Sequence, residues 1–185
     1  MNMSVAASAI RLALVGALVA VALALGVSPT QAKTCPSDRV GGKTIGWIEF
    51  DDVKVPLKSV TYPAGGALDP PASAEVAGVS TRHQPLLARQ GSTVIAWHVR
   101  YGKGCSGALN PLLNREMGST FDIVTRNGDR QEYRLVDKEK VKRGRYKPEW
   151  FRTNGAPQVS LFTCSDLTDG KFRTTTALFA EPIRG

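Results

Sequence analysis

Residues 159–180 read VSLFTCSDLTDGKFRTTTALFA, and this stretch decides the fold. Two runs rich in β-branched and aromatic residues, 159–164 and 172–180, flank the polar link 165–171. Runs of this length and composition on either side of a short link with Asp and Gly predict two antiparallel strands joined as a hairpin. The rest of the chain is interpreted outward from this hairpin.

Short runs of the same character recur along the chain and are separated by clusters of Gly, Pro, Asn and Asp. They predict strands near 44–50, 53–60, 76–79, 93–99, 120–126, 131–137, 159–164 and 172–180. Asp51-Asp52 and Asn127-Gly128 are expected to be turns, the second a two-residue hairpin turn. Eight short strands in a chain of 185 residues predict an all-β domain, either a closed barrel or a sandwich.

Two segments stand apart from the strand pattern. Residues 108–117 can form a short helix, which Pro111 keeps short, with the leucines of the segment turned inward. Those leucines are Leu109, Leu112 and Leu113. Residues 138–158 form one long polar connection, and connections of that length inside a compact domain are usually functional or mobile.

The N-terminal segment has the layout of an export signal. Arg11 precedes sixteen residues, 12–27, that carry no charged or strongly polar side chain, and small residues follow at Thr30 and Ala32. A helix of that length rises about 24 Å, which is short of the hydrocarbon core of a bilayer, so cleavage is favoured over retention as an anchor. We expect residues 1–32 to be a signal peptide or signal anchor and residues 33–185 to be the exported domain.

The chain is basic, with 24 Lys and Arg against 16 Asp and Glu and a formal net charge of +8. An exported domain with this excess is attracted to anionic lipid or cell-wall polymer. Six basic residues form one run: Lys138, Lys140, Lys142, Arg143, Arg145 and Lys147. Only Tyr146 is interleaved, so the run lacks the stacking aromatics of a nucleic-acid surface, and we interpret it as a solvated loop. No nucleic-acid partner is expected.

The three cysteines are Cys35, Cys105 and Cys164. In an oxidising compartment, an odd cysteine is either intermolecular or a free thiol. Cys35 lies near the expected mature terminus and Cys105 lies in a glycine-rich loop. These two cysteines can therefore form a disulfide, which would leave Cys164 as the unpaired cysteine. With two histidines and no Cys-x-x-Cys, the chain predicts no metal site, and no cofactor is expected.

A free thiol becomes a nucleophile only as the thiolate, which needs a base or a cationic neighbour. His98 lies in the strand-like run 93–99 and is the candidate base, whereas His83 lies in a polar loop; a lone histidine is more often structural. If the 159–180 hairpin pairs Cys164 opposite Arg173, their Cβ atoms lie about 5 Å apart on one face. Arg173 would then favour the thiolate and bind a developing oxyanion. The alternative is an ordinary exposed arginine.

Taken together, these motifs resemble the sortases, particularly the actinobacterial class E and class F types. The residues that carry the resemblance are Gly91–Val99, Gly107–Leu112, Leu161–Cys164 and Arg173, with Gly66–Pro71 similar to the segment that precedes the histidine strand in that family. The resemblance covers roughly residues 41–185. It implies an eight-stranded sortase-like β-barrel with one or two short helices.

The resemblance also implies a cysteine transpeptidase. Cys164 would attack the threonine carbonyl of a Leu-Pro-x-Thr-Gly-like sorting signal and form a thioacyl enzyme, and His98 would transfer protons to and from the amines. Arg173 would hold the substrate backbone or the oxyanion, and Thr163 would line the substrate site. Trp97 stands where the family has glycine, so it is expected to contact substrate or narrow the groove, unless it is simply a half-buried aromatic.

The partners implied are surface proteins with sorting signals and an amine of the cell wall or of a pilin, or else water. The location implied is extracytoplasmic, with membrane contact through the N-terminal segment if it is uncleaved. One alternative is an L,D-transpeptidase with Cys105 as nucleophile, because Gly104–Gly107 half matches that family's motif. A papain-like peptidase fits poorly because its cysteine precedes its histidine. The others are a non-catalytic cationic wall-binding barrel and a sortase inactivated through Trp97.

Overall fold

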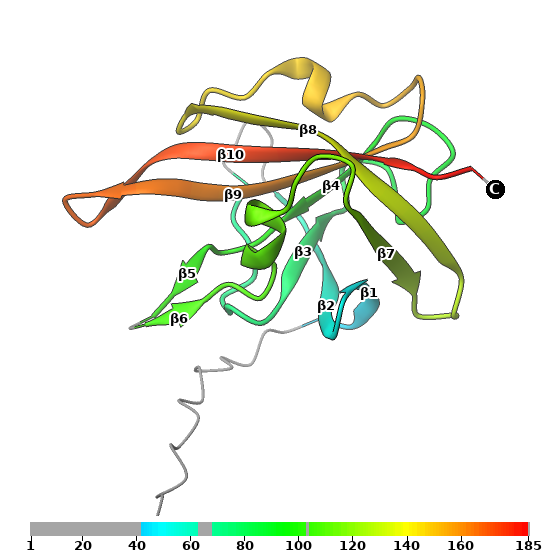
Figure 1. The fold of residues 1–185 in the computed structure, drawn as a ribbon, viewed down its shortest axis with the longest axis horizontal. Coiled ribbons are helices and arrows are strands. Elements are labelled where there is room, and N and C mark those ends of the chain that lie inside the picture. The colour runs from blue at the N-terminus through cyan, green and yellow to red at the C-terminus, as the bar shows by residue number, and fades with distance from the viewer. Residues whose placement is uncertain (1–41, 63–67, 103, 185) are drawn as a thin grey trace, which may run out of the picture. The chain divides into compact units, whose positions relative to one another are not determined.

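The computed structural model describes residues 42–62, 68–102 and 104–184 (Figure 1). Regular structure in these ranges is β-strand apart from two short 3-10 helices. The strands are β1 (Thr44–Phe50), β2 (Val53–Val60), β3 (Ala77–Ser80), β4 (Ser92–Ala96), β5 (Arg100–Tyr101), β6 (Cys105–Ser106), β7 (Thr120–Thr125), β8 (Arg130–Lys142), β9 (Gln158–Thr168) and β10 (Lys171–Pro182). The helices are η1 (Asn110–Asn114) and η2 (Pro148–Phe151).

Eight of the strands close into a barrel in the order β1-β2-β3-β4-β9-β10-β8-β7. Neighbours are antiparallel except for the parallel pairs β2–β3 and β4–β9. The eight-stranded closed barrel predicted from the sequence is confirmed. The hairpin β9–β10 projects beyond the barrel, and the small sheet β5–β6, which was not predicted, lies on the same side of the molecule (Figure 1).

Two turns explain how the first and third hairpins form. β1 and β2 are joined by Asp51-Asp52 alone, as predicted, and Asp51 has a positive φ of 47°. β7 and β8 are joined by the longer loop 126–129, in which Gly128 has a φ of 92°. Glycine adopts that left-handed conformation without steric cost, so the Asn127-Gly128 pair still marks the reversal although the loop exceeds two residues.

The hydrophobic residues form two clusters on opposite faces of the sheet. The inner cluster fills the barrel and includes residues from every barrel strand. It also includes Leu109, which directly precedes the short helix η1, and Leu112, which lies within η1. The outer cluster lies on the outside of β4, β9 and β10 and is covered by Trp150 and Phe151 of η2. Burying a large apolar side chain stabilises the fold by roughly 1.5–3 kcal/mol, so η2 holds its segment firmly against the outer face.

Three predicted boundaries are wrong. The link between the last two strands was expected at 165–171, but β9 runs to Thr168 and β10 begins at Lys171, so only Asp169 and Gly170 join them. The run 93–99 was expected to be one strand, but β4 ends at Ala96, because the chain after it turns away to form β5. Residues 138–142 were expected in a loop, but β8 continues through them and pairs with β10. Their side chains are mostly exposed, so no apolar alternation marks the strand in the sequence. The connection that remains, 143–157, contains η2.

Candidate active site

The parallel pairing of β4 with β9 sets the chain segments that carry His98 and Cys164 side by side. Ala96 lies opposite Phe162, and the Trp97 amide donates to the Phe162 carbonyl at 3.1 Å. Continued for two residues, this register would bring His98 level with Cys164. Ala96 and Phe162 both belong to the outer cluster, and side chains two residues apart share a face of a strand. The imidazole and the thiol are therefore on the same outer face, and both residues are half-buried.

Trp97 and Thr163 lie on the opposite, inner face. The Trp97 side chain is 1% exposed and packs inside the barrel, so it is fully buried rather than half-buried, and its predicted contact with substrate stays a prediction. Thr163 is 4% exposed, and its hydroxyl donates to the Trp97 carbonyl at 2.8 Å. This bond ties β9 to the segment that carries His98. The structure thus favours a positioning role for Thr163 over the substrate contact expected from the resemblance.

A carboxamide that the sequence analysis left without a role fixes the backbone around His98. Asn110 accepts a hydrogen bond from the Trp97 indole at 3.1 Å and donates to the Val99 carbonyl at 2.7 Å. Gly107 packs against the His98 carbonyl so closely that a Cβ there would lie 1.9 Å from the oxygen. Both residues belong to the 107–112 motif, so the signal was present in the sequence, but the contacts that explain it are long-range.

The expectation that Arg173 lies opposite Cys164 is wrong, because the residue opposite is Thr175. The register is set by a two-residue turn, Asp169-Gly170, in which both residues have positive φ, 52° and 70°. Arg173 consequently lies two residues closer to the turn than the partner of Cys164. Its guanidinium is half-exposed, with Nη2 3.6 Å from Oδ2 of Asp169. Its catalytic role stays a prediction.

A second arginine, Arg143, acts on the thiol. It directly follows β8, and its amide donates to the Arg173 carbonyl at 2.9 Å, which continues the ladder between β8 and β10. Burial raises the pKa of the Cys164 thiol, and the positive charge of Arg143 acts in the opposite direction. The sequence predicts Arg143 only as part of a solvated basic run, because the pairing of β8 with β10 is not visible in the sequence.

Other groups shift the pKa values of the two candidate catalytic residues. Burial raises the pKa of the Cys164 thiol, Arg143 opposes this, and the Asp69 carboxylate adds to it. Burial lowers the pKa of His98, whereas Asp69 and a hydrogen bond from the imidazole to the Pro70 carbonyl act in the opposite direction. At neutral pH these shifts favour a neutral thiol beside a neutral imidazole. Asp69 belongs to the 66–71 stretch, for which the sequence analysis named no role.

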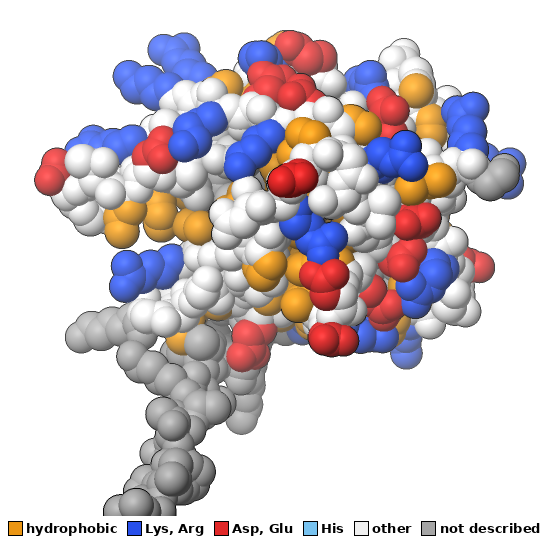
Figure 2. Space-filling model, viewed as in Figure 1, with side chains coloured by type: hydrophobic (Ala, Val, Ile, Leu, Met, Phe, Trp, Pro, Cys, Tyr) orange, Lys and Arg blue, Asp and Glu red, His pale blue; other side chains and the backbone are white. Residues whose placement is uncertain are grey.

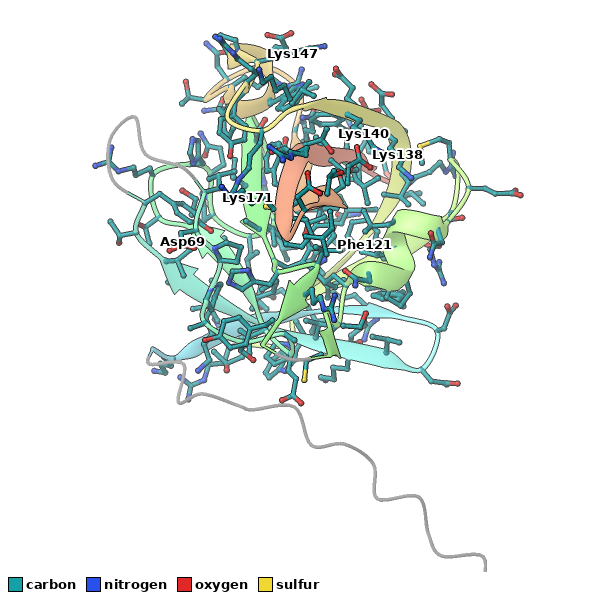
Figure 3. The ribbon with its side chains drawn as sticks, turned by 90° about the vertical axis from the view of Figure 1, so that its left-hand side faces the viewer. Asp69, Phe121, Lys138, Lys140, Lys147 and Lys171 are labelled. Atoms are coloured by element: carbon teal, nitrogen blue, oxygen red, sulfur yellow. The ribbon has the colours of Figure 1, made fainter. Side chains whose placement is uncertain are left out.

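Figure 3 looks onto the end of the barrel where the β9–β10 hairpin projects and shows Asp69 on one side of it. Lys138, Lys140 and Lys147 are labelled above the hairpin in this view, and part of the basic run is paired rather than simply solvated. The contacts join Lys138 to the Leu113 carbonyl, Lys140 to Asp166 and Lys147 to Glu139. Salt bridges at exposed positions stabilise a fold by about 1 kcal/mol or less. These contacts therefore contribute little to stability and mainly hold the three lysine side chains in place.

The other cysteines and the second histidine lie outside this pair. Cys164 is a free thiol, whereas Cys105 is buried and disulfide-bonded. Cys35 lies outside the described residues, so its predicted pairing with Cys105 stays a prediction. A buried, oxidised sulfur cannot be a nucleophile, which counts against the L,D-transpeptidase reading. His83 contacts Ser80 through Nδ1 at 2.7 Å and does not join Cys164.

Over the described ranges, no group of His, Cys, Asp and Glu side chains could hold a metal ion. No helix within those same ranges is long and apolar enough to cross a membrane. The predicted signal segment, residues 1–32, lies outside them, and its role stays a prediction.

An open groove of about 460 Å³ lies next to the segments that carry His98 and Cys164, and neither of these two residues is among those that line it. It runs between the β5–β6 sheet and the β9–β10 hairpin. Val99 and Ser165, which follow His98 and Cys164 in the chain, are among the residues that line it.

No protein-family model and no curated protein matches the sequence. Solved structures do match. A lid mutant of sortase A from Corynebacterium diphtheriae has a TM-score of 0.59 and 16% identity over 79% of this chain and 73% of that one. Sortase C-1 from Actinomyces oris has a TM-score of 0.58 and 15% identity, over 77% and 76% of the two chains. Sortase A from Listeria monocytogenes has a TM-score of 0.55 and 17% identity, over 76% and 88%.

These similarities confirm the predicted fold. They span sortases of the A and C types and three genera, at identities too low to carry over an activity or a substrate. The described part of the chain is a sortase-like β-barrel.

Proposed function

We propose that the protein is a sortase-type cysteine transpeptidase in which Cys164 is the nucleophile and His98 the general acid and base. The observation that supports the proposal is the parallel pairing of β4 and β9, whose register, continued past Ala96 and Phe162, would bring the imidazole and the free thiol to one outer face of a sortase-like barrel. Nucleophilic catalysis by cysteine needs this pairing of a thiol with a proton acceptor. The order of the motifs along the chain supports class E or class F.

The reaction would proceed in two acyl transfers. His98 takes the thiol proton, and Sγ of Cys164 attacks the carbonyl carbon of threonine in a Leu-Pro-x-Thr-Gly-like signal. The tetrahedral intermediate collapses as the C–N bond breaks, and the imidazolium gives its proton to the departing glycine amine. An incoming amine, or water, then attacks the thioester, loses a proton to His98 and releases the thiolate.

The resting protonation states shape how this chemistry begins. Because burial disfavours the charged form of both groups, the thiolate–imidazolium pair is the minor form before substrate binds. Arg143 stabilises the thiolate through its charge. Arg173, released from Asp169, would be the donor to the oxyanion, where a planar guanidinium offers paired N–H groups. Asp69 would stabilise the imidazolium.

The substrates would be surface proteins with sorting signals, and the acceptor an amine of the cell wall or a pilin. The domain would therefore act outside the cytoplasm. It would stay at the membrane if residues 1–32 are retained as an anchor, and it would be released if they are cleaved.

Mass spectrometry tests the proposal directly. The full chain, incubated with a library of Leu-Pro-x-Thr-Gly peptides, is expected to gain the mass of the acyl fragment on Cys164. The Cys164→Ala variant should gain nothing, and His98→Gln should acylate far more slowly. If the wild type forms no adduct with any peptide, while its thiol alkylates at the rate of an exposed free cysteine, the non-catalytic wall-binding barrel is the better reading.

A further inference from the structure

The β9–β10 hairpin projects beyond the barrel and ends in the turn Asp169-Gly170 (Figure 1). Residues 159–163 of β9 are buried in the barrel, whereas residues 166–170 are exposed. The end of β8 accompanies the hairpin, because Lys142 pairs with Thr174 of β10. We call residues 140–145 and 166–173 together the hairpin tip. Most of its side chains are open to a partner on the outside of the barrel.

Two apolar side chains share one face of the hairpin tip. Leu167 and Phe172 lie opposite each other in the β9–β10 ladder, so their side chains stand side by side. Leu167 is 48% exposed, and Phe172 is half-buried. Figure 2 shows apolar side chains along the lower edge of the projecting hairpin. A partner that covers these side chains removes apolar surface from water, which is favourable.

The hairpin tip also carries half of the chain's formal net charge of +8, because it holds six basic and two acidic residues. Both acidic side chains have a basic partner within the tip. Lys140 lies 2.9 Å from Asp166, and Arg173 lies 3.6 Å from Asp169. The other four basic residues are exposed, and none forms an ion pair with an acidic side chain of the described residues: Lys142, Arg143, Arg145 and Lys171. Their positive charge is therefore left to act on a partner.

The apolar and the basic side chains lie next to each other. Lys142 is on the same face as Phe172, because its partner Thr174 is two residues from Phe172 on β10. Basic groups beside exposed apolar ones fit a partner that is negative at its surface and apolar beneath. An anionic bilayer is such a partner, because lysine and arginine bind its headgroups while apolar side chains enter the boundary of the acyl chains. A soluble anionic polymer would bind the charges but would not bury Leu167.

We propose that the hairpin tip docks on the surface of an anionic lipid bilayer, with Leu167 and Phe172 among the headgroups and Lys142 and Lys171 at the lipid phosphates. This inference needs neither the proposed transpeptidase activity nor the N-terminal segment, since the described residues supply both kinds of contact. Cys164 precedes Leu167 by three residues, which is about 10 Å along the strand. Docking would therefore hold the candidate active site next to the bilayer surface.

The test uses the full chain with lipid vesicles. Because the N-terminal segment is itself expected to bind bilayers, the readout is confined to the hairpin tip. Vesicles of phosphatidylcholine are compared with vesicles rich in phosphatidylglycerol, and amide hydrogen exchange is followed by mass spectrometry. Only the anionic vesicles are expected to slow exchange in 166–173, and high salt should reverse the effect because it screens the charges. Equal exchange with both kinds of vesicle would overturn the proposal.

Two variants test the two kinds of contact. Lys142→Gln combined with Lys171→Gln should weaken docking about 25-fold, because each lysine near an anionic surface contributes about fivefold to the binding constant. Leu167→Ser should weaken docking about tenfold, because the apolar side chain is no longer buried in the bilayer. Arg89→Gln combined with Arg126→Gln removes the same charge from exposed loop positions and is the matched control. If the control weakens docking as much as the lysine variant does, the net charge of the chain attracts the lipid and the hairpin tip does not.

Tryptophan fluorescence tests whether the apolar side chain enters the bilayer. In anionic vesicles with brominated acyl chains, Leu167→Trp should show quenching that the wild type lacks, because bromine quenches only nearby indoles. Val136→Trp is the matched control, since Val136 is 43% exposed but lies about 20 Å before Lys142 along β8. Equal quenching of the two variants would contradict docking through the hairpin tip.

A soluble polymer serves as the competing partner. If poly(glycerol phosphate) slows exchange in 166–173 as much as the anionic vesicles do, and Leu167→Ser does not change this, the partner is an anionic polymer and the bilayer proposal is wrong. Protection that needs both the vesicles and Leu167 supports the bilayer.

Discussion

Two arginines stand near Cys164, and they differ in what they contact. Arg143 acts on the thiol through its charge, whereas Arg173 is turned to Asp169. Replacing Arg143 by alanine is expected to raise the pKa of Cys164 further, because a nearby positive charge favours the thiolate. The pH profile of iodoacetamide alkylation should move to higher pH, and Arg143→Lys should restore it. If the alkylation profile of Arg143→Ala matches that of the wild type, the charge of Arg143 has no effect on the pKa of Cys164.

Arg173 has a different expected signature. If it turns from Asp169 to the substrate, it stabilises charge that develops only during acylation, so Arg173→Ala should slow thioacyl formation by roughly 100- to 1000-fold. The alkylation profile should stay where it is. Arg173→Lys should recover little, because a point charge cannot reproduce a planar pair of donors. Near-normal acylation by folded Arg173→Ala would remove this residue from the mechanism.

At the scale of elements, the segment that follows β4 is held in place by the first residue of η1. Asn110, just inside η1, bonds to the Trp97 indole, to the Val99 carbonyl and to the Ser106 hydroxyl at 2.8 Å. Asn110→Ala leaves a buried indole N–H without an acceptor, which should cost about 1–3 kcal/mol in urea unfolding. Acylation should fall as well, because His98 lies within the released segment. Ser106→Ala removes one acceptor only and is the control. Equal stability of the two variants would contradict this account.

The elements also show what the sequence could and could not predict. The strands of the β9–β10 hairpin follow from their β-branched and aromatic residues, but the register follows from the turn, and two positive φ values at Asp169 and Gly170 move Thr175 into the place expected for Arg173. His98 and Cys164 were identified because their motifs are local. Arg143 and Asp69 were not, because their effects depend on pairings and loops far apart in the chain.

At the scale of the whole molecule, buried and paired titratable groups set the pH range of stability. Burial lowers the pKa of His83 and His98 below the ordinary 6.5, and ion pairs lower those of Glu49 and Glu139 below 4.5. For each of these groups the unfolded chain binds more protons than the folded one as the pH falls through this range. Their contributions are therefore present above the unfolded pKa and are lost on acidification, the histidines first.

On the alkaline side the sign is reversed. Burial raises the pKa of Cys164 above 9.0 and that of Tyr133 to about 12, so the unfolded chain loses these protons first and stability falls as the pH rises. Thermal unfolding is therefore expected to show a plateau between pH 6.5 and 9.0. His83→Gln combined with His98→Gln should flatten the limb between pH 6.5 and 4.5, and Cys164→Ala should delay the alkaline limb. An acid limb that keeps its slope in the double variant would mean that other groups set the acid limit.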